Sequence, residues 1–564
     1  MSNFSTLLSK YTSIFHAFVW IAIVGMIALF GYFVYIFAYN YPYYDDFDNL
    51  ILFLSEYIRS DGISGKIMLL FEQNFEHRVI FAKVLTLLYY KIAGEIDIKA
   101  LILLGDLSLA GVFIFFVLLK RDRKLSLLSL FAIACLLFQL QHYEDSISWA
   151  TCSLQHAPCI FFSLWSFYLA IFRKKFPLSA ILAVVALFTS ANGMMTILIW
   201  LIIFYSSAKR SLSHIGLSLA VISVTLIHLL TLKMYSGSVL GNFTSNFFPK
   251  CILLLSFAGQ LADSKVVGYD APGIVLGTLF LIPFVIAAFK LALGRGKDIS
   301  QLQWFCLAGL TSVLFVGFLI TFARGTEPDH FGYKLDRYKI YAAFFGVFAI
   351  GFYDQYWNHL FWGKLVRFSL ASIAFVFCLS SYYLYADKTE NYRNDIMTNQ
   401  INYAWNKGTY FPIVFRNNLS AADFDFCLRT FFFPKPDPVE KALKTIEWNK
   451  LTKTINFSKS DDNKVLKLTN TDLKMDTGSG ASQLFVVATM PDRGQPKYIF
   501  PINNTYKRSV RHFFTSFRKI PMDGFDVTIF KEKIENADYQ LNLVYFVDNK
   551  IVDIYNLGPM HVSR

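Results

Sequence analysis

Residues 17–39, AFVWIAIVGMIALFGYFVYIFAY, form an apolar run that contains no charged side chain. About 20 apolar residues are enough for a helix to cross the hydrocarbon core of a bilayer. The run lacks a small-residue cleavage site of the kind that ends a signal peptide. We therefore expect residues 17–39 to cross a membrane and to remain attached as an anchor.

The composition extends this expectation to most of the chain. Hydrophobic residues make up 55% of the 564 residues, with 59 Phe and 31 Tyr, and the mean hydropathy is +0.43. Apolar runs follow one another from residue 17 to residue 386, after which the sequence is polar and mixed. This pattern predicts an α-helical polytopic membrane protein, with a transmembrane domain in residues 1–386 and a soluble C-terminal domain in residues 387–564.

Charge and cysteine content exclude two further features, a nucleic-acid-binding face and a disulfide in the soluble domain. The formal net charge is +13, but Lys and Arg gather in short clusters between apolar runs, which is a signature of topology and not of a nucleic-acid-binding face. Only Cys427 of the seven Cys lies in the soluble part, which excludes a disulfide within that domain. The basic clusters are KRDRK (120–124), RKK (173–175), KR (209–210) and RGK (295–297).

Placing all these clusters in the cytoplasm gives a consistent topology of about eleven spans. The loop of residues 40–95, most of residues 233–270 and the C-terminal domain then lie outside, which is the periplasm for a bacterial inner membrane. Residues 79–93 contain Lys83 and Lys91 and are expected to form an interfacial helix. The expected spans are residues 17–39, 97–119, 126–141, 156–172, two legs within 177–207, 212–232, 271–293, 301–322, 339–353 and 365–386.

The stretch PLSAILAVVALFTSANGMMTILIWLIIFYSS (177–207) has a basic cluster at each end, so the chain must reverse at SANG (190–193). Each leg is then about 20 Å of helix, shorter than the hydrocarbon core of about 30 Å. Irregular backbone at that depth is tolerated where it lines a cavity or is buried in protein. We expect an outward-facing cavity with Asn192 and Gly193 near its floor. One alternative is a single tilted span of 31 residues with a different topology. For Asn192, the alternative to substrate contact is a turn in which Gly193 supplies a permissive backbone.

The soluble part begins with a helical or extended stalk (387–408), and a short helix is expected at residues 438–446. Runs of period two, separated by Gly, Asn, Asp and Pro turns, dominate the remainder. This pattern is typical of an antiparallel β-sandwich. The runs are KVLKLTN (464–470), QLFVVATM (483–490), KYIFPI (497–502), GFDVTIF (524–530), YQLNLVYFV (539–547) and KIVDIYNL (550–557).

Nearly every His, isolated Arg and buriable carboxylate of the membrane part falls on the predicted outer side. A channel or symmetric transporter would carry polar groups along its spans, so this distribution favours an active site open to the outside. A carboxylate base, Arg side chains for a phosphate and an apolar surface suit glycosyl transfer from a polyprenyl-phosphate sugar. The outer motifs are YYDDFD (43–48), FEQNFEHR (71–78), HYEDSISW (142–149), SANG (190–193) and FARGTEPDHFGYKLDRY (322–338).

Together these motifs resemble the bacterial O-antigen-modifying glucosyltransferases, which belong to the GT-C class of membrane glycosyltransferases. The resemblance covers the membrane domain and, loosely, the C-terminal domain; the chain has LDRY (335–338) where the family pattern would have SRY. It implies an undecaprenyl-phosphate-linked glucose as donor. It also implies the O-antigen of lipopolysaccharide, or its lipid-linked precursor, as acceptor, inversion at the anomeric carbon and a periplasmic site.

Asp45 and Asp46 are the candidates for the general base, and the resemblance favours the first. Two adjacent side chains cannot both face one cavity on a regular helix or strand. The other carboxylate could orient a partner or bind a divalent metal; no other cofactor is expected. Asp48 is expected to cap a helix or to be solvated.

The remaining candidates are assigned to the donor and the sugar. We expect Arg324 and Arg337 to hold the leaving phosphate, although Arg at span ends can also simply snorkel to the interface. Asp145, beside Glu144, is expected to be solvated, and Trp149 could instead belong to an interfacial aromatic belt. Further donor-phosphate candidates are Arg78 and His77, and the substrate-binding candidates are Glu76, Glu144, Trp149, Gln155, Asn192 and Tyr338.

Other functions remain open at this stage. A GT-C transferase acting on another lipid or a protein acceptor would have the same motifs. A transporter or flippase of lipid-linked sugars would place polar groups on both faces and along the spans. An O-antigen polymerase or ligase would be expected to have one large external loop in place of a C-terminal β domain.

Overall fold

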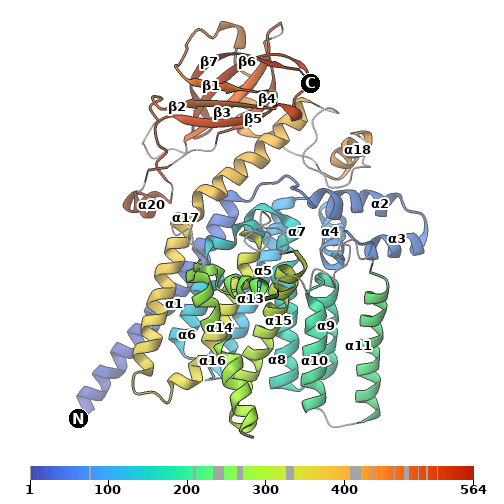
Figure 1. The fold of residues 1–564 in the computed structure, drawn as a ribbon, viewed down its shortest axis with the longest axis vertical. Coiled ribbons are helices and arrows are strands. Elements are labelled where there is room, and N and C mark those ends of the chain that lie inside the picture. The colour runs from blue at the N-terminus through green and yellow to red at the C-terminus, as the bar shows by residue number, and fades with distance from the viewer. Residues whose placement is uncertain are drawn as a thin grey trace. The chain divides into compact units, whose positions relative to one another are not determined.

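The computed structural model describes residues 2–74, 78–122, 124–207, 211–232, 247–262, 271–324, 336–406, 421–432, 436–462, 464–475, 482–492, 494–502, 506–507, 509–517 and 519–563. It is mostly helical, and the chain divides into two compact units (Figure 1). Helix α17 (Gly363–Trp405) runs without a break through the last boundary between them. The first unit holds Met1–Ile36, Ser60–Leu85 and Leu101–Tyr382, and the second holds Phe37–Arg59, Thr86–Ala100 and Tyr383–Arg564.

By length and composition, seven helices in the described part of the chain could cross a membrane, as expected for a polytopic membrane protein. The number expected from the sequence was larger because it counted four further apolar segments as spans. These segments are helical but are shorter or less apolar than the seven. The seven are Ser13–Phe37 of α1 (Ser2–Phe37), α5 (Ile98–Arg121), Ala150–Arg173, α11 (Leu212–Leu230), α14 (Ala271–Ala292), Gln301–Phe322 of α15 (Gln301–Arg324) and α17.

The four further segments and several short elements are also helical. Helix α4 (Ile80–Ala93) is the expected short helix, and Lys83 donates to the carbonyls of Leu69 and Glu72 at the end of α3 (Gly62–Phe71), at 2.9 Å each. The other elements are α6 (Leu127–Leu137), η2 (Leu140–His142), η3 (Glu144–Ser148), α7 (Ala150–Ser153), α8 (His156–Tyr168), η4 (Leu169–Arg173), α9 (Phe176–Thr189), α10 (Gly193–Ser207), α13 (Phe247–Ala258), η5 (Gln260–Ala262), η6 (Gly296–Asp298), η8 (Asp336–Tyr338) and α16 (Lys339–Trp357).

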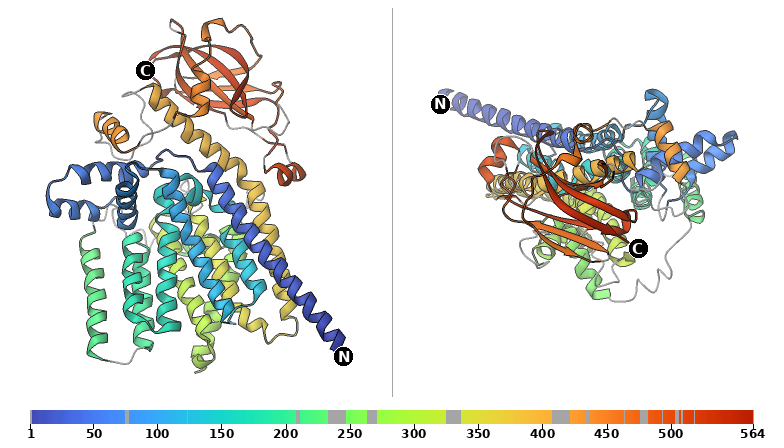
Figure 2. Two further views of the ribbon diagram at one scale, coloured as in Figure 1. Left: turned by 180° about the vertical axis from the view of Figure 1, so that it is seen from behind. Right: turned by 90° about the horizontal axis from the view of Figure 1, so that it is seen from above.

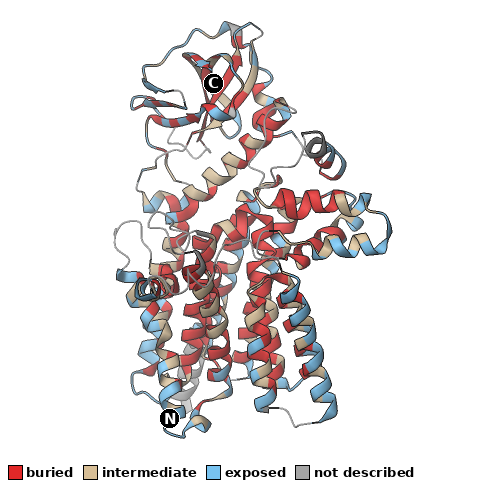
Figure 3. Cartoon of the chain, turned by 45° about the vertical axis from the view of Figure 1, so that its right-hand side comes forward, coloured by how far each residue is buried: buried red, intermediate tan, exposed pale blue. Residues whose placement is uncertain are grey.

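Helix α16 is a buried central element of the first unit. Every residue from Lys339 to Phe352 is buried, and the helix packs against α6, α14 and α15 (Figure 3). A helix that is apolar on all sides needs either lipid or protein around it, and here other helices surround it. Gly309 of α15 allows a close approach, because a Cβ there would lie 2.5 Å from the ring of Phe348.

Helix α13 lies in a stretch that the sequence placed outside the membrane. It is an apolar helix that packs against α14 and α15. Its contact with α14 depends on small residues, since a Cβ on Gly277 would overlap the carbonyl of Leu255 and one on Gly259 would overlap that of Gly273. Gly273 and Gly277 form a GxxxG spacing, which allows two helix backbones to approach closely.

Helices α9 and α10 form the expected hairpin, and α11 packs beside them (Figures 1 and 2). Helix α9 ends at Thr189 and α10 begins at Gly193, so the alternative of a single tilted span is wrong. Each leg is about 21 Å long at 1.5 Å per residue. Gly193 is required for close packing and not for a permissive backbone, because a Cβ there would overlap the carbonyl of Ala186.

Gly193→Ala should therefore destabilise the hairpin by about 1–3 kcal/mol, the usual cost of overpacking. Gly31→Ala in α1 is the matched control, since a Cβ at Gly31 meets no atom within 4 Å. The control should be neutral or should stabilise the protein by about 0.5–1 kcal/mol. Apparent unfolding temperatures of the two purified variants provide the comparison, and equal temperatures would contradict the close contact.

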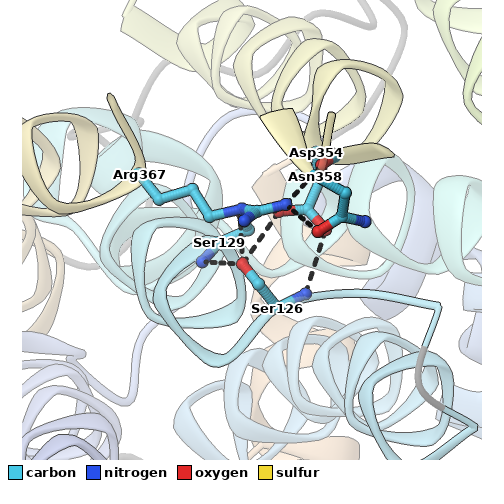
Figure 4. A network of polar contacts seen from close by, with 5 residues as sticks. All are labelled: Ser126, Ser129, Asp354, Asn358 and Arg367. Carbon is cyan, nitrogen blue, oxygen red and sulfur yellow. Dashed lines mark hydrogen bonds and ion pairs between the residues drawn. The ribbon is translucent and has the colours of Figure 1, made fainter. Parts of the chain in front are cut away.

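A buried ion pair joins three helix ends of the first unit (Figure 4). Arg367 Nε donates to Asp354 Oδ1 at 2.8 Å, and the two side chains are 8% and 2% exposed. Arg367 Nη2 also donates to the backbone carbonyl of Asp354 and to Asn358 Oδ1, each at 2.6 Å. The hydroxyls of Ser126 and Ser129 donate to Asp354 Oδ1 at 2.8 and 2.5 Å, and the Ser126 N–H donates to Oδ2 at 3.0 Å. The network ties the start of α6 to α16 and α17.

Arg367→Met should cost about 3–5 kcal/mol, because it leaves the Asp354 carboxylate buried without its cation. Arg295→Met is a control on an exposed pair with Asp298 of similar length, 2.7 Å, and should cost less than about 1 kcal/mol. Thermal unfolding of the solubilised protein measures both. A small loss for Arg367→Met would show that Asp354 is solvated or protonated there.

The second unit contains two antiparallel sheets, as the six runs of period two predict. The strand orders are β1-β2-β5 and β4-β3-β6-β7, and all pairs are antiparallel. Asp548 and Asn549 have φ of 49° and 61°, which suits the tight turn between β6 and β7. The strands are β1 (Ser458–Asp461), β2 (Val465–Asn470), β3 (Ser482–Met490), β4 (Gln495–Pro501), β5 (Phe525–Phe530), β6 (Ala537–Val547) and β7 (Lys550–Val562).

Helix α17 supplies part of the core of this unit, so the expected stalk is helical. Met397 and Ile401 of α17 pack with Val439 and Leu443 of α19 (Pro438–Leu443) against the four-stranded sheet. Asn402 fixes the contact, since it donates to the Ile499 carbonyl at 2.8 Å and accepts from the Ile499 N–H at 2.7 Å. The short helices here are η1 (Phe47–Leu52), α2 (Phe53–Arg59), α18 (Ala421–Phe431), α19 (Pro438–Leu443), η9 (Trp448–Lys450), α20 (Val510–Ser516) and η10 (Lys531–Lys533).

Candidate functional site

A buried carboxylate–imidazole pair lies in the first unit, between η3 and α8. His156 Nδ1 and Asp145 Oδ1 are 2.7 Å apart, and the side chains are 7% and 2% exposed. The expectation that Asp145 is solvated is therefore wrong. Asp145 lies in a π-helical turn, Glu144–Ser148, and His156 is the first residue of α8. The hydrogen bond fixes the orientation of the imidazole ring, as a carboxylate does for a catalytic histidine.

Arg337 lies beside this pair at the end of the segment that leads into α16. Its backbone N–H donates to Glu144 Oε2 at 2.9 Å. Its guanidinium lies 5.5 Å from the ring centre of Trp149 and 5.1 Å from that of Tyr338, within the range of cation–π attraction. Its Nε is buried and has no hydrogen-bond partner among the described residues. The Arg337 guanidinium is thus fixed in position, and its Nε–H remains available to donate a hydrogen bond.

Asn192, in the turn of the hairpin, joins the same group of residues. Its Nδ2 donates to the hydroxyl of Tyr341 at 2.9 Å, and the Tyr341 ring lies 5.4 Å from that of His156. Gln155 Nε2 donates to Ser190 Oγ at 3.3 Å, which ties the start of α8 to the same turn. Residues 142–156, 190–192 and 337–341, which are far apart in the sequence, therefore meet in one cluster.

A small cavity of about 20 Å³, enough for about one water molecule, lies beside this cluster between α8, α10, α15 and α16. Asn192 and Tyr341 line it, together with Ser163, Thr196 and Ser312. The rest of the lining is apolar. Asn192 was expected to line a cavity, whereas Gly193, expected beside it, is not part of this lining.

The charges in the cluster influence one another. Burial raises the pKa of Asp145 above its ordinary value, although His156 and Arg337 oppose this effect. Burial acts to lower the pKa of Arg337, but the net direction is upward because of Tyr338, Cys152, Glu144 and Asp145. Arg337 therefore stays protonated in its buried setting and can attract a further anion.

Asp145, Cys152 and His156 are the side chains here that could hold a metal, with one ligand atom of each within 4.8 Å of the others. Zinc ligands at about 2.0–2.2 Å in tetrahedral geometry lie about 3.3 Å apart. The atoms of Asp145 and His156 are only 2.7 Å apart, which fits a direct hydrogen bond better. We therefore treat the two residues as a hydrogen-bonded pair.

Other predicted site residues of the first unit lie elsewhere or outside the description. Arg78 caps the end of α11: its Nη1 donates to Thr231 Oγ1 at 2.8 Å and to the His228 carbonyl at 3.3 Å, and its Nη2 donates to the Thr231 carbonyl at 2.6 Å. Such a contact satisfies free carbonyls at a helix C-terminus. Arg324 ends α15, but its side chain lies outside the described residues, as do Glu76 and His77.

Asp45 and Asp46 belong to the second unit and differ in their surroundings. Asp46 is fully buried, and its Oδ2 accepts the N–H of Tyr43 at 3.1 Å, whereas Asp45 is partly exposed. Asp48 is buried within η1 and is not solvated. Tyr44 has φ of 44°, an uncommon conformation for a residue with a side chain, and the π-helical turn Phe47–Leu52 follows. Asp45 thus lies in a strained turn with access to solvent.

Sequence reasoning missed His156, Tyr341 and Cys152 and misjudged Asp145. A signal was present, because ionisable residues within apolar segments are rare and mostly functional. His156 begins an apolar run and lies eleven residues after Asp145, too far apart in sequence for a local pattern to pair them. No protein-family model, curated protein or solved structure matches the chain.

Asp145→Ala should destabilise the protein by about 1–3 kcal/mol, because it leaves His156 Nδ1 buried without a partner. The chain offers a matched control. Asp538 and His561 form a pair of the same type and length, 2.7 Å, with side chains 76% and 68% exposed. Asp538→Ala should change stability by less than about 0.5 kcal/mol. Thermal unfolding of both variants tests this, and a small effect at Asp145 would contradict the buried pair.

Proposed function

We propose that the protein is an inverting glycosyltransferase that uses a polyprenyl-phosphate-linked sugar, with glucose as the expected sugar. The expected acceptor is the O-antigen of lipopolysaccharide or its lipid-linked precursor, on the periplasmic side of a bacterial inner membrane. The observation that carries the proposal is the cluster around Arg337. The guanidinium lies beside aromatic rings and a buried carboxylate–imidazole pair, and its Nε–H has no hydrogen-bond partner among the described residues.

Arg337 is the proposed ligand of the leaving phosphate. When the bond between the anomeric carbon and the phosphate oxygen breaks, negative charge accumulates on the phosphate. A cation fixed in advance, in surroundings of low polarity, stabilises that charge without having to reorganise. Glu144 and the rings of Trp149 and Tyr338 keep Arg337 in place. We assign this role to Arg337 before Arg78, because the Arg78 guanidinium already caps α11.

Asp45 is the proposed general base. In the reaction it takes the proton of the acceptor hydroxyl, whose oxygen then attacks the anomeric carbon from the face opposite the phosphate. The surroundings of the two carboxylates support this choice, since Asp46 is buried and accepts a backbone N–H from Tyr43, whereas Asp45 is partly exposed. Asp46 is accordingly assigned to holding the turn.

The sugar is expected to lie near Arg337 and the turn of the hairpin. Asn192 and Gln155 carry amide groups in this cluster, and Trp149 and Tyr338 carry aromatic rings, the two kinds of contact that suit a sugar. The Asp145–His156 pair adds an imidazole of fixed orientation. It can donate or accept a hydrogen bond at its second nitrogen.

The decisive experiment compares lipopolysaccharide from cells with the gene, without it, and with Asp45→Asn, Asp46→Asn or Arg337→Gln. Mass spectrometry and NMR measure the added hexose. Asp45→Asn should reduce transfer by about 100-fold or more, because an amide cannot accept the proton. Asp46→Asn should retain most of the transfer, because its amide oxygen can still accept the Tyr43 N–H. Arg337→Gln should also reduce transfer strongly.

Arg295→Gln, at an exposed ion pair outside the cluster, is the control for loss of a cation. All variants must be shown to reach the membrane in equal amounts. Lipopolysaccharide that is identical with and without the gene, although the donor is present, would remove the O-antigen as acceptor. If cells without the gene still add the sugar once the donor is supplied on the outer side, but no longer move the donor to the outer leaflet, the protein would be a transporter.

A further inference from the structure

The segment YKRSVRHFFTSFRK (506–519) in the second unit has a composition that glycosyl transfer does not explain. It contains five Lys and Arg, three Phe and no Asp or Glu. Clusters of Lys and Arg with aromatic residues are typical of segments that bind anionic lipid surfaces. The short helix α20 lies within this segment.

The two ends of the segment are fixed to each other. Tyr506 pairs with Pro521 in an antiparallel bridge, and the Lys507 N–H donates to the Ile520 carbonyl at 2.8 Å. Helix α20 is therefore carried on a closed loop and not on a loose tail. Ser509 caps the helix by accepting the His512 N–H at 3.4 Å.

The loop packs on α17 where the apolar stretch of that helix ends. Phe513 is buried, and its ring lies 5.6 Å from that of Tyr383. Lys519 Nζ lies 3.0 Å from Asp387 Oδ1, and the Tyr506 hydroxyl donates to Glu390 at 3.2 Å. Asp387 is the first charged residue of α17 after Arg367. Tyr at the end of an apolar span, followed by charged residues, is typical of the headgroup region of a membrane.

The side of α20 that is not packed on α17 combines positive charge with apolar surface. Lys507 and Arg511 are exposed, and Val510 between them is 56% exposed. Three acidic groups of the described residues lie near the loop. Asp387 and Glu390 are engaged with Lys519 and Tyr506, and Asp523 is engaged with Lys474 and the Met475 N–H. The Met475 N–H and Lys474 lower the pKa of Asp523, and Lys507 contributes to this, but Lys507 and Arg511 both remain exposed to an external anion.

We propose that the α20 loop is a binding site for the phosphate headgroups of anionic phospholipids. Lys507 and Arg511 contact the phosphate, and Val510 lies against the outermost acyl carbons. The position of the loop at the end of a membrane span argues for a lipid as the occupant in preference to a soluble anion. The proposal does not depend on glycosyl transfer and would hold for any function of the membrane part.

The test uses the full-length protein in nanodiscs of phosphatidylcholine, with or without phosphatidylglycerol. A polarity-sensitive fluorophore is attached at Val510→Cys, in a Cys251→Ser background, because Cys251 is the one cysteine that is not buried. Val552→Cys on β7 is the matched control, with a valine 52% exposed. Emission at position 510 should shift to shorter wavelength with phosphatidylglycerol. The shift should be lost with Lys507→Gln and Arg511→Gln, and reduced by high salt.

Three results would overturn the proposal. Equal emission at positions 510 and 552 in both lipids would place α20 in water. An equal shift in both lipids would show apolar contact without recognition of a charged headgroup. A shift produced by a soluble anionic polysaccharide, and not by phosphatidylglycerol, would assign the loop to the polysaccharide.

Discussion

The burial of α16 constrains the rest of the first unit. The polar side chains that are buried near the two ends of this helix must find hydrogen-bond partners, because no water reaches them. At the start of α16, Tyr341 lies beside His156 and Asn192. At its end, Asp354 pairs with Arg367. The two positions are about 20 Å apart along the helix at 1.5 Å per residue.

The two buried carboxylates, Asp354 and Asp145, differ in how completely they are paired. Asp354 accepts hydrogen bonds on both carboxylate oxygens, from Ser126, Ser129 and Arg367. Near the start of α16, Asp145 Oδ2 and Arg337 Nε are buried and have no hydrogen-bond partner among the described residues. A buried network that is fully paired holds a structure together, whereas unpaired groups in a native protein require an explanation. A ligand with both donors and acceptors, such as a sugar phosphate, supplies one.

Features with a local cause could be predicted from the sequence. The hairpin at 190–193 follows from two apolar legs between basic clusters, and the strands follow from their period of two. Features that depend on tertiary contacts could not. The role of Arg78 depends on where α11 ends, and the burial of Asp145 depends on His156, which a reading of nearby residues does not connect to it. Helix α13 was missed because its short apolar run becomes recognisable only through its glycine contacts with α14.

The backbone conformation at the two acidic motifs helps to decide whether they are functional sites or solvated loops, independently of their side-chain chemistry. In both YYDDFD and HYEDSISW the carboxylates lie at or within a π-helical turn, Phe47–Leu52 in one case and Glu144–Ser148 in the other. Such turns are rare and are frequent at functional sites, although a third one, Leu169–Arg173, adjoins the basic cluster RKK. Tyr44, just before Asp45, also has a positive φ. Strained backbone persists only where the surrounding structure imposes it, so these carboxylates are held where local preference would not put them. Solvated boundary loops would have no reason to retain such geometry, and this argues against that interpretation of either motif.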